Sequence, residues 1–248
     1  MLIGKHIVRK DEVASTNDLV KGRGKDGEPE GLVLVARSQT AGRGRMGKSW
    51  SSPEGGLYLS ALVRPNFSTK ELLRLTVFAC VPVATALEEV SGVRVQVKWP
   101  NDLEVEGRKV GGILVEGVSK LNHLDFVVIG VGINVKGDPG VEGSVSLEEA
   151  AGKDLDLEVL LQAILQHLDS FYMKLIAGQF DEDDYVRRSS VLGHYIEAKV
   201  GNQILEGKAL YINSDGALVV RSEGLLIRLG HVSETSLRVV EGPESGGT

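Results

Sequence analysis

The chain has little of what marks a secreted or membrane-embedded protein. Among its 248 residues there is one cysteine, Cys80, so an internal disulfide and a cysteine metal site are excluded. Cys80 lies in an apolar run, which favours a small buried residue over a nucleophile. No apolar run approaches the length of a transmembrane helix. Lys5, His6, Arg9 and Lys10 interrupt the N-terminal apolar stretch, so we expect no signal peptide and a cytoplasmic location.

The chain also lacks an excess of positive charge. It has 28 Lys and Arg against 34 Asp and Glu, a net charge of −6, and neither a basic stripe nor a basic tail. A general binder of nucleic acid or of anionic membranes is therefore not expected. The five histidines show no metal-ligand spacing and no Ser-His-Asp arrangement; they are His6, His123, His167, His194 and His231.

One stretch lacks acidic residues altogether. Residues 31–53 contain no Asp or Glu, and within them Gly42 to Trp50 reads GRGRMGKSW. This glycine–arginine loop (Gly42 to Trp50) fits both the dinucleotide fingerprint G-x-G-x-x-G and the phosphate loop G-x-x-x-x-G-K-S. Both motifs require a helix to begin at once, whereas Ser52-Pro53 followed by Gly55-Gly56 is typical of a turn. We therefore expect a flexible loop whose backbone N–H groups and cations bind a phosphate or carboxylate. A solvated surface loop is the alternative.

Apolar patterning predicts strands and helices in an α+β order. We expect strands at 3–8, 32–36, 57–63, 93–99, 109–116 and 124–135, with a turn at 119–123. Ser15 to Asp18 has the polar caps of a helix start, 22–31 is a loop, and 71–90 is helical with a kink or break at Pro82. Apolar residues at spacings of three and four between Leu161 and Leu175 predict one face of a helix that ends near Gly178.

The composition changes after about residue 188. Short strand candidates at 195–200, 204–212, 217–222, 225–229 and 236–240 alternate with Gly, Asp and Asn turns, which suggests a small β-barrel. Residues 181–184 are most simply a solvated helix start. We therefore expect a domain over 1–188, a barrel domain over 189–241 and a disordered tail over 242–248.

Three further motifs follow strands or begin them. Lys98 to Asp102 (KWPND) places amide and carboxylate oxygens beyond a strand that Pro100 ends. Lys109 begins a buried strand and precedes Gly111 and Gly112. The two glycines indicate that another group approaches the backbone closely beside the Lys109 ammonium. The alternative is a β-hairpin in which the glycines only allow tight packing. Asn134 interrupts an apolar strand and needs partners there, either as a loop cap or as a ligand contact.

Together these motifs resemble those of the biotin–protein ligases. The motifs in order are Ser15-Thr16-Asn17, Gly42 to Trp50, Gly56 to Ser60, Lys98 to Asp102, Lys109 to Glu116 and Gly130 to Val135. Each is weak alone, but six in order are specific. Met46 and Lys48 stand where many relatives carry arginine.

The resemblance implies a fold, a reaction and partners. The fold is a mixed sheet flanked by helices, as in class II synthetases, with a C-terminal SH3-like barrel. In the reaction, the biotin carboxylate attacks the α-phosphate of ATP, giving biotinyl-5′-AMP and pyrophosphate, with Mg²⁺ assisting. A lysine of a biotin carboxyl carrier protein then displaces AMP. A repressor's N-terminal DNA-binding segment has no room before Ser15, so no DNA binding is expected, and the resemblance leaves room for a homodimer.

The resemblance also implies roles for individual residues. The catalytic residues would be Arg45, Lys109 and Asp102, with Asp102 as the Mg²⁺ ligand or as acceptor of the amine proton. The biotin site would comprise Ser15, Thr16, Asn17, Gln39, Gly42, Arg43, Gly44, Lys109, Gly111 and Gly112, with Arg43 using its backbone. The ATP site would comprise Arg45, Trp50, Lys98, Asn101 and Asn134.

Other functions remain to be weighed. A lipoate–protein ligase shares the adenylation chemistry, although the glycine–arginine loop and KWPND are more typical of biotin ligases. A P-loop NTPase would require a helix after Gly47, and a non-catalytic binding module would be favoured by loss of Arg45 or Lys109, both of which are present.

Overall fold

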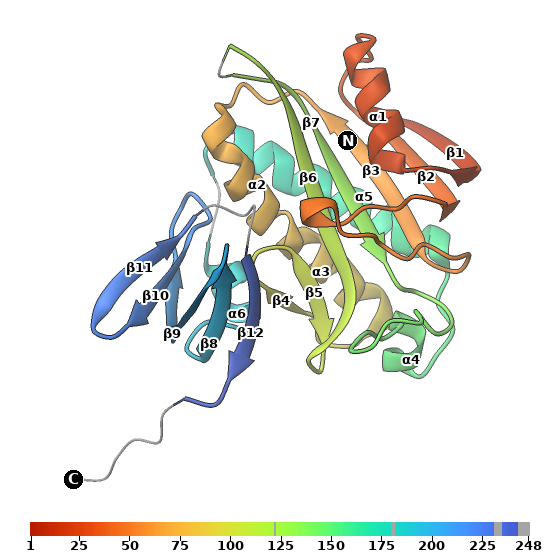
Figure 1. Ribbon diagram of the computed structural model, residues 1–248. Coiled ribbons are helices and arrows are strands. Elements are labelled where there is room, and N and C mark those ends of the chain that lie inside the picture. Colours follow the sequence, from red (N-terminus) through yellow and green to blue (C-terminus); the bar gives the residue numbers. More distant parts are fainter. Residues whose placement is uncertain (122, 180–181, 231–234, 243–248) are drawn as a thin grey trace.

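The larger of two sheets forms the centre of the molecule. A computed structural model describes residues 1–121, 123–179, 182–230 and 235–242. Seven strands lie in the order β1-β2-β3-β7-β6-β5-β4, with β1 and β2 parallel and the other neighbours antiparallel. Their bounds are β1 His6–Val13, β2 Leu32–Gln39, β3 Leu57–Val63, β4 Gln96–Lys98, β5 Asp102–Val105, β6 Arg108–Lys120 and β7 His123–Ile133. The expected mixed sheet is confirmed (Figure 1).

Helices cover both faces of this sheet, which explains its nearly continuous apolar strands. On one face, Val20 of α1 (Thr16–Lys25) packs with Leu32, Leu34 and Phe126. On the other face, Val33 and its alternating neighbours pack in the main core with α3 (Cys80–Ser91) and α5 (Leu157–Ile176). Figure 1 shows α1 on the opposite side of the sheet from α3 and α5.

The helix predicted from the spacing of Leu161 to Leu175 is α5. The Asp156 side chain caps its start by accepting bonds from the backbone N–H groups of Glu158 and Val159. The buried residues of α5 include Leu161, Ile164, Leu165, Leu168, Tyr172 and Leu175, the predicted apolar face. No described helix is long and apolar enough to cross a membrane.

A second, antiparallel sheet of five strands forms the C-terminal part, in the order β11-β10-β9-β8-β12. The strands are β8 Tyr195–Val200, β9 Gln203–Ile212, β10 Leu218–Ser222, β11 Leu225–Leu229 and β12 Thr235–Val240, close to the predicted ones. A turn of this barrel is attached to the larger sheet, because the buried Trp99 indole N–H donates to the Gly216 carbonyl at 2.9 Å. A Cβ on Gly216 would lie 3.0 Å from the carbonyl oxygen of Leu73 in α2 (Leu72–Phe78), so the turn packs closely there.

Several predicted boundaries differ from the structure. The first strand, expected at 3–8, is β1 at His6–Val13. The loop expected from residue 22 begins later, because α1 continues through Gly24, whose backbone approaches the Phe126 ring too closely for any side chain. The predicted helical break at Pro82 lies at Ala79, between α2 and α3, and Pro82 occupies the first turn of α3, where proline is tolerated. The strand expected at 93–99 shortens to β4.

One strand residue and one helix were not predicted, and some predicted segments lie partly outside the described residues. Glu104 belongs to β5, and its side chain is buried with its carboxylate on Lys98. The helix α4 (Leu147–Ala151) was not predicted. The helix start expected at 181–184 is α6 (Asp183–Arg188), with residue 181 outside the described residues, as is the tail from 243.

Candidate active site

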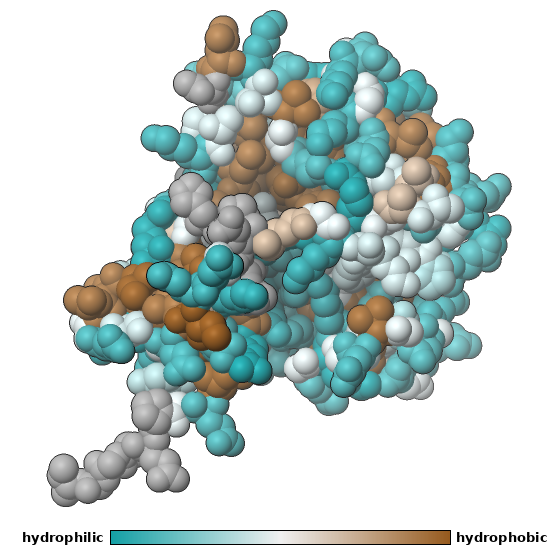
Figure 2. All heavy atoms as spheres, in the orientation of Figure 1, coloured by the Kyte–Doolittle hydropathy of each residue, from teal (hydrophilic) through white to brown (hydrophobic). Residues whose placement is uncertain are grey.

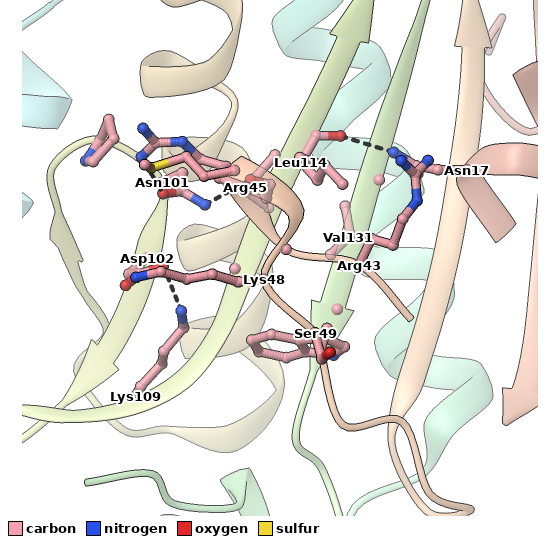
Figure 3. A pocket seen from close by; sticks show the side chains of 18 of the residues that line it. Asn17, Arg43, Arg45, Lys48, Ser49, Asn101, Asp102, Lys109, Leu114 and Val131 are labelled. Atoms are coloured by element: carbon pink, nitrogen blue, oxygen red, sulfur yellow. Dashed lines mark hydrogen bonds and ion pairs between the residues drawn. The ribbon is translucent and has the colours of Figure 1, made fainter. Parts of the chain in front are cut away.

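A cavity brings together most of the residues that the motifs singled out. Its walls come from the start of α1, the end of β2, the glycine–arginine loop, the β4–β5 turn, the first half of β6 and the end of β7 (Figure 3). Of the predicted site residues, those lining it are Ser15, Thr16, Asn17, Gln39, Arg43, Gly44, Arg45, Trp50, Lys98, Asn101, Asp102, Lys109 and Gly112. The motifs, far apart in sequence, therefore converge on one place.

The glycine–arginine loop is a small hairpin over this cavity. Arg43 pairs with Ser49, the Gly44 N–H donates to the Lys48 carbonyl at 2.7 Å, and the Trp50 N–H donates to the Gly42 carbonyl at 2.9 Å. Its tip, Arg45–Gly47, is one turn of 3₁₀ helix with Met46 at φ 59°. No α-helix follows the glycines in this fully described segment, so the requirement of a phosphate loop or dinucleotide fingerprint is not met.

The guanidinium of Arg43 is neutralised within the protein. Its Nη2 lies 2.5 Å from Asp18 Oδ1 and 3.1 Å from Glu116 Oε2. Asp18 belongs to α1 and Glu116 to β6, so Arg43 ties the base of the loop to both elements. The Arg43 side chain therefore already has two carboxylate partners, and the expected contact of its backbone with biotin stays a prediction.

Arg45 lies at the other side of the cavity. Its Nη1 donates to Asn101 Oδ1 at 2.9 Å, and Asn101 is bonded through its own amide to the Ile113 carbonyl of β6. Burial lowers the pKa of Arg45 to about 10, against the opposing effect of the Asp102 carboxylate. The guanidinium remains protonated at neutral pH but is poorly solvated, which strengthens its attraction for an incoming anion.

Lys109 presents its ammonium to the cavity beside Asp102 and Trp50. Its Nζ lies 2.6 Å from Asp102 Oδ1 and 5.2 Å from the centre of the Trp50 ring. Gly132 leaves room for that ring, because a Cβ there would lie 2.7 Å from Trp50 Nε1. Trp50 Nε1 is buried without a hydrogen-bond partner among the described residues.

The opposite end of the cavity is neutral and polar. Gln39 Oε1 accepts from the Thr16 N–H at 2.8 Å, and Gln39 Nε2 donates to Ser52 Oγ at 2.9 Å. The hydroxyl of the fully buried Ser60 lies 2.7 Å from Thr16 Oγ1 and 2.6 Å from Asn17 Oδ1. These bonds fix the orientation of the Thr16 and Gln39 side chains.

Asn17, which the resemblance places in the biotin site, lines the cavity with its polar atoms turned to protein groups. Its amide oxygen faces Ser60, and its Nδ2 donates to Glu116 Oε2 at 2.9 Å and to the Leu114 carbonyl at 3.3 Å. Gly130 makes room for it, because a Cβ there would lie 2.2 Å from Asn17 Oδ1. Asn17 borders the cavity, but its polar atoms are bonded to protein groups.

Three predicted site residues do not line the cavity. Gly42 is packed so that a Cβ would lie 2.5 Å from Ser52 Oγ, and Gly111 is packed against Ile133. Asn134 bonds to backbone: its N–H donates to the Val110 carbonyl at 2.8 Å and its side chain to the Lys109 carbonyl at 3.5 Å. Their roles in binding biotin or ATP stay predictions. Lys98 does border the cavity, with its Nζ on Glu104 Oε1 at 2.9 Å.

Some lining residues were not predicted as site residues. They are Met46, Lys48, Ser49, Leu59, Trp99, Pro100, Ile113, Leu114, Gly130, Val131, Gly132 and Leu237. The apolar ones look like core positions in a sequence, and Leu237 comes from the barrel strand β12. All of them except Leu237 lie within the six motifs, which was the signal that could have identified them.

The residues that line the cavity suit a metal ion that binds together with the phosphates of a substrate. Asp102 is the only carboxylate among the described residues that line the cavity, and no cluster of three His, Cys, Asp or Glu occurs in the described part of the chain. Mg²⁺ characteristically uses one or two carboxylates together with substrate phosphates and water. Asp102 could therefore hold such an ion, whereas a resident protein-only metal site is not present among these residues.

Comparison with known proteins gives consistent similarities. A profile of the "Biotin/lipoate A/B protein ligase family" matches residues 11–134. The chain is 33% identical over 234 residues to the "Bifunctional ligase/repressor BirA" of Bacillus subtilis, covering 90% of this chain and 72% of that protein. It is 30% identical to the "Biotin--[acetyl-CoA-carboxylase] ligase" of Paracoccus denitrificans, covering 76% and 83%. The structure of a biotin protein ligase from Aquifex aeolicus in complex with biotin and ATP matches with a TM-score of 0.82 and 31% identity, covering 95% of this chain and 100% of that one.

Proposed function

Because the chain belongs to the biotin/lipoate A/B protein ligase family, we propose that it activates biotin with ATP and transfers it to a lysine of a biotin carboxyl carrier protein. The observation that supports this most is the division of the cavity. Arg45 and Lys109 supply positive charge at one end, and Thr16 and Gln39 supply neutral hydrogen-bonding groups at the other. This arrangement suits a ligand with a neutral polar ring and a carboxylate.

In the first step, an oxygen of the biotin carboxylate attacks the α-phosphorus of ATP and pyrophosphate leaves. Both reactants are anions, so cations must offset their repulsion and the charge that grows on the phosphoryl oxygens. Lys109 and Arg45 have this role in our proposal. Mg²⁺, bound through Asp102, would neutralise the phosphates of the nucleotide.

In the second step, the acceptor amine attacks the carbonyl carbon of the mixed anhydride, and AMP leaves. The amine must lose a proton, and Asp102 is the candidate acceptor within the described cavity wall. Its carboxylate would have to exchange its contact with Lys109 for the incoming amine. The Trp50 indole would contact the nucleotide.

The remaining parts of the proposal concern the whole chain. Residues 1–188 would carry the biotin and ATP sites, and the barrel over 189–241 would border them through Leu237. We place the reaction in the cytoplasm, where ATP and carboxylases are available, and allow for a homodimer. We expect no sequence-selective DNA binding, because the net charge is −6; an operator-selective mobility shift at physiological salt would contradict this.

Biotin-dependent exchange between pyrophosphate and ATP tests the function. The exchange should require biotin and Mg²⁺, and lipoate should not replace biotin. Exchange supported equally by lipoate would instead assign the chain to the lipoate branch of the family. Exchange with neither acid would contradict an adenylating ligase.

A further inference from the structure

The tip of the glycine–arginine loop, Arg45–Gly47, contains no buried residue that could hold it closed. Its hairpin has few backbone bonds, and Met46 at its tip is exposed. Glycines at Gly42, Gly44 and Gly47 give the loop a large conformational entropy when it opens. Apart from Trp50, which packs against Gly132 at the end of the loop, polar side chains make the contacts that keep the loop over the cavity.

The two arginines of the loop point in opposite directions. In Figure 3 Arg45 lies beside Asn101, whereas Arg43 lies beside Asn17 on the far side of the cavity. Arg45 is thus placed where it can meet an anion. Arg43 is placed where its guanidinium meets Asp18 and Glu116.

Glu116 is well suited to hold this guanidinium. Its side chain is only 19% exposed, compared with 53% for Asp18, so its ion pair is less screened by water. Lys21 donates to its Oε1 at 2.8 Å and Asn17 to its Oε2 at 2.9 Å, which fixes the carboxylate before Arg43 arrives. The site is preorganised for a cation from the loop.

The same carboxylate is connected to the polar end of the cavity. Glu116 bonds Asn17, and Asn17 bonds Ser60, which lies against Thr16. Thr16 bonds Gln39, and Gln39 bonds Ser52, just beyond the loop. Both ends of the loop are therefore joined to one set of hydrogen bonds beneath the cavity.

We propose that Glu116, assisted by Asp18, is a positioning residue that holds the glycine–arginine loop closed through Arg43 and so slows escape of the activated intermediate. Neither residue of this carboxylate clamp (Asp18 and Glu116) lines the cavity. The proposal rests on the proposed function, since the retained molecule is biotinyl-5′-AMP.

The test measures how fast the intact protein releases biotinyl-5′-AMP formed from radiolabelled biotin and ATP. Glu116→Gln keeps an oxygen that can accept from Asn17 but removes the charge that attracts Arg43. We expect release to accelerate about tenfold, with turnover in pyrophosphate exchange at saturating substrates changed less than about twofold. Trypsin should also cut the loop of this variant faster at Lys48.

Lys21→Gln is the matched control. It removes another ion pair of Glu116 but leaves the pair with Arg43. If Glu116 served only to join α1 to β6, Lys21→Gln would accelerate release as much as Glu116→Gln, and this result would overturn the proposal. We expect release from Lys21→Gln to stay within about twofold of the unaltered protein.

A double variant shows whether Glu116 acts through Arg43. The Arg43 side chain is 37% exposed, so Arg43→Gln should not prevent folding. This variant is expected to accelerate release as Glu116→Gln does. Combining the two should add little further acceleration, because either change breaks the same contact. Fully multiplicative effects, or normal release from Arg43→Gln, would refute the clamp. Absence of biotin-dependent exchange in the unaltered protein would instead refute the proposed function.

Discussion

Lys109 is held in the cavity by two neighbours, the Asp102 carboxylate at 2.6 Å and the Trp50 ring at 5.2 Å. Its ammonium is therefore ordered before any substrate binds, and reorientation during reaction is not required. Arg45 is held similarly by Asn101. At this scale the site consists of two preplaced cations that differ in solvation.

Lys109→Ala should reduce biotin-dependent pyrophosphate exchange at least tenfold, about 1.4 kcal/mol in the barrier. The reason is that the ammonium stabilises charge that grows on the phosphoryl oxygens. Biotin binding, measured by calorimetry without ATP, should weaken less. Lys136→Ala, which breaks an ion pair with Glu148 and does not line the cavity, is the matched control. Unchanged exchange in Lys109→Ala would remove this lysine from the chemistry.

Arg45→Met should make the protein more stable and less active. Burial lowers the pKa of Arg45 to about 10 in the folded protein, from 12.5. A base with a lowered folded pKa destabilises the fold by the full amount at every pH below the folded value, and this cost disappears only as the pH rises from the folded value through the unfolded one.

At pH 7.5 the cost is fully present, so the melting temperature of Arg45→Met should rise. In a chain of this size each kcal/mol corresponds to about 2–4 °C. Pyrophosphate exchange should fall at least tenfold. A lower melting temperature together with normal exchange would show that Arg45 is a structural residue.

The motifs predicted which residues meet, but not how each side chain is used. Asn17 lies at the site, yet its bonds go to Ser60 and Glu116, because Gly130 opens a space that only the folded sheet reveals. Leu237 could not be identified, since an apolar residue in a barrel strand carries no sign of a distant cavity. The local sequence indicates which chemical groups the site contains, whereas the packing of the fold determines which partner each group bonds.

At the scale of elements, the loop over the cavity is a hairpin and not the start of a helix. The sequence predicted this from Ser52-Pro53, and the turn at Arg45–Gly47 agrees. Helix limits were harder to predict, because the close approach of Gly24 to Phe126 compensates the poor helix propensity of glycine. The break was predicted at Pro82 but lies at Ala79. Proline is tolerated at Pro82 because backbone N–H groups in the first turn of a helix have no partner within the helix.

Ligands should protect the loop from proteolysis. Lys48 is exposed in the hairpin, and opening of the hairpin would admit trypsin. Biotin plus ATP should slow cleavage at Lys48 by about tenfold, because the adenylate adds contacts to the closed loop. Biotin alone should slow it less. Equal cleavage rates with and without ligands would mean that the loop does not order over its substrates.

At the scale of the whole molecule, the barrel contacts the larger sheet beside the candidate active site. The Trp99 indole donates to Gly216 of the barrel, and the next residues along the chain are Pro100, Asn101 and Asp102. The number and type of barrel strands followed from the Gly and Asp turns. Their attachment did not, because a hydrogen bond between residues 117 apart leaves no local pattern.

Trp99→Phe should therefore weaken both the fold and the site. It leaves the Gly216 carbonyl buried without its donor, which costs about 1–3 kcal/mol. Urea unfolding should show this loss, and pyrophosphate exchange should fall because the following turn carries Asn101 and Asp102. Gly216→Ala, which places a Cβ 3.0 Å from the Leu73 carbonyl oxygen at φ +88°, should act in the same direction. Unaltered stability in both variants would mean that the barrel is not coupled to the site.

The transfer of labelled biotin to an isolated biotin carboxyl carrier domain tests the ligase function most directly. We predict that the label becomes covalently attached only when ATP and Mg²⁺ are both supplied. It should disappear when the acceptor lysine is replaced by arginine, and Lys109→Ala should slow it at least tenfold. Transfer without ATP, or no transfer from the unaltered protein with all components present, would contradict the account.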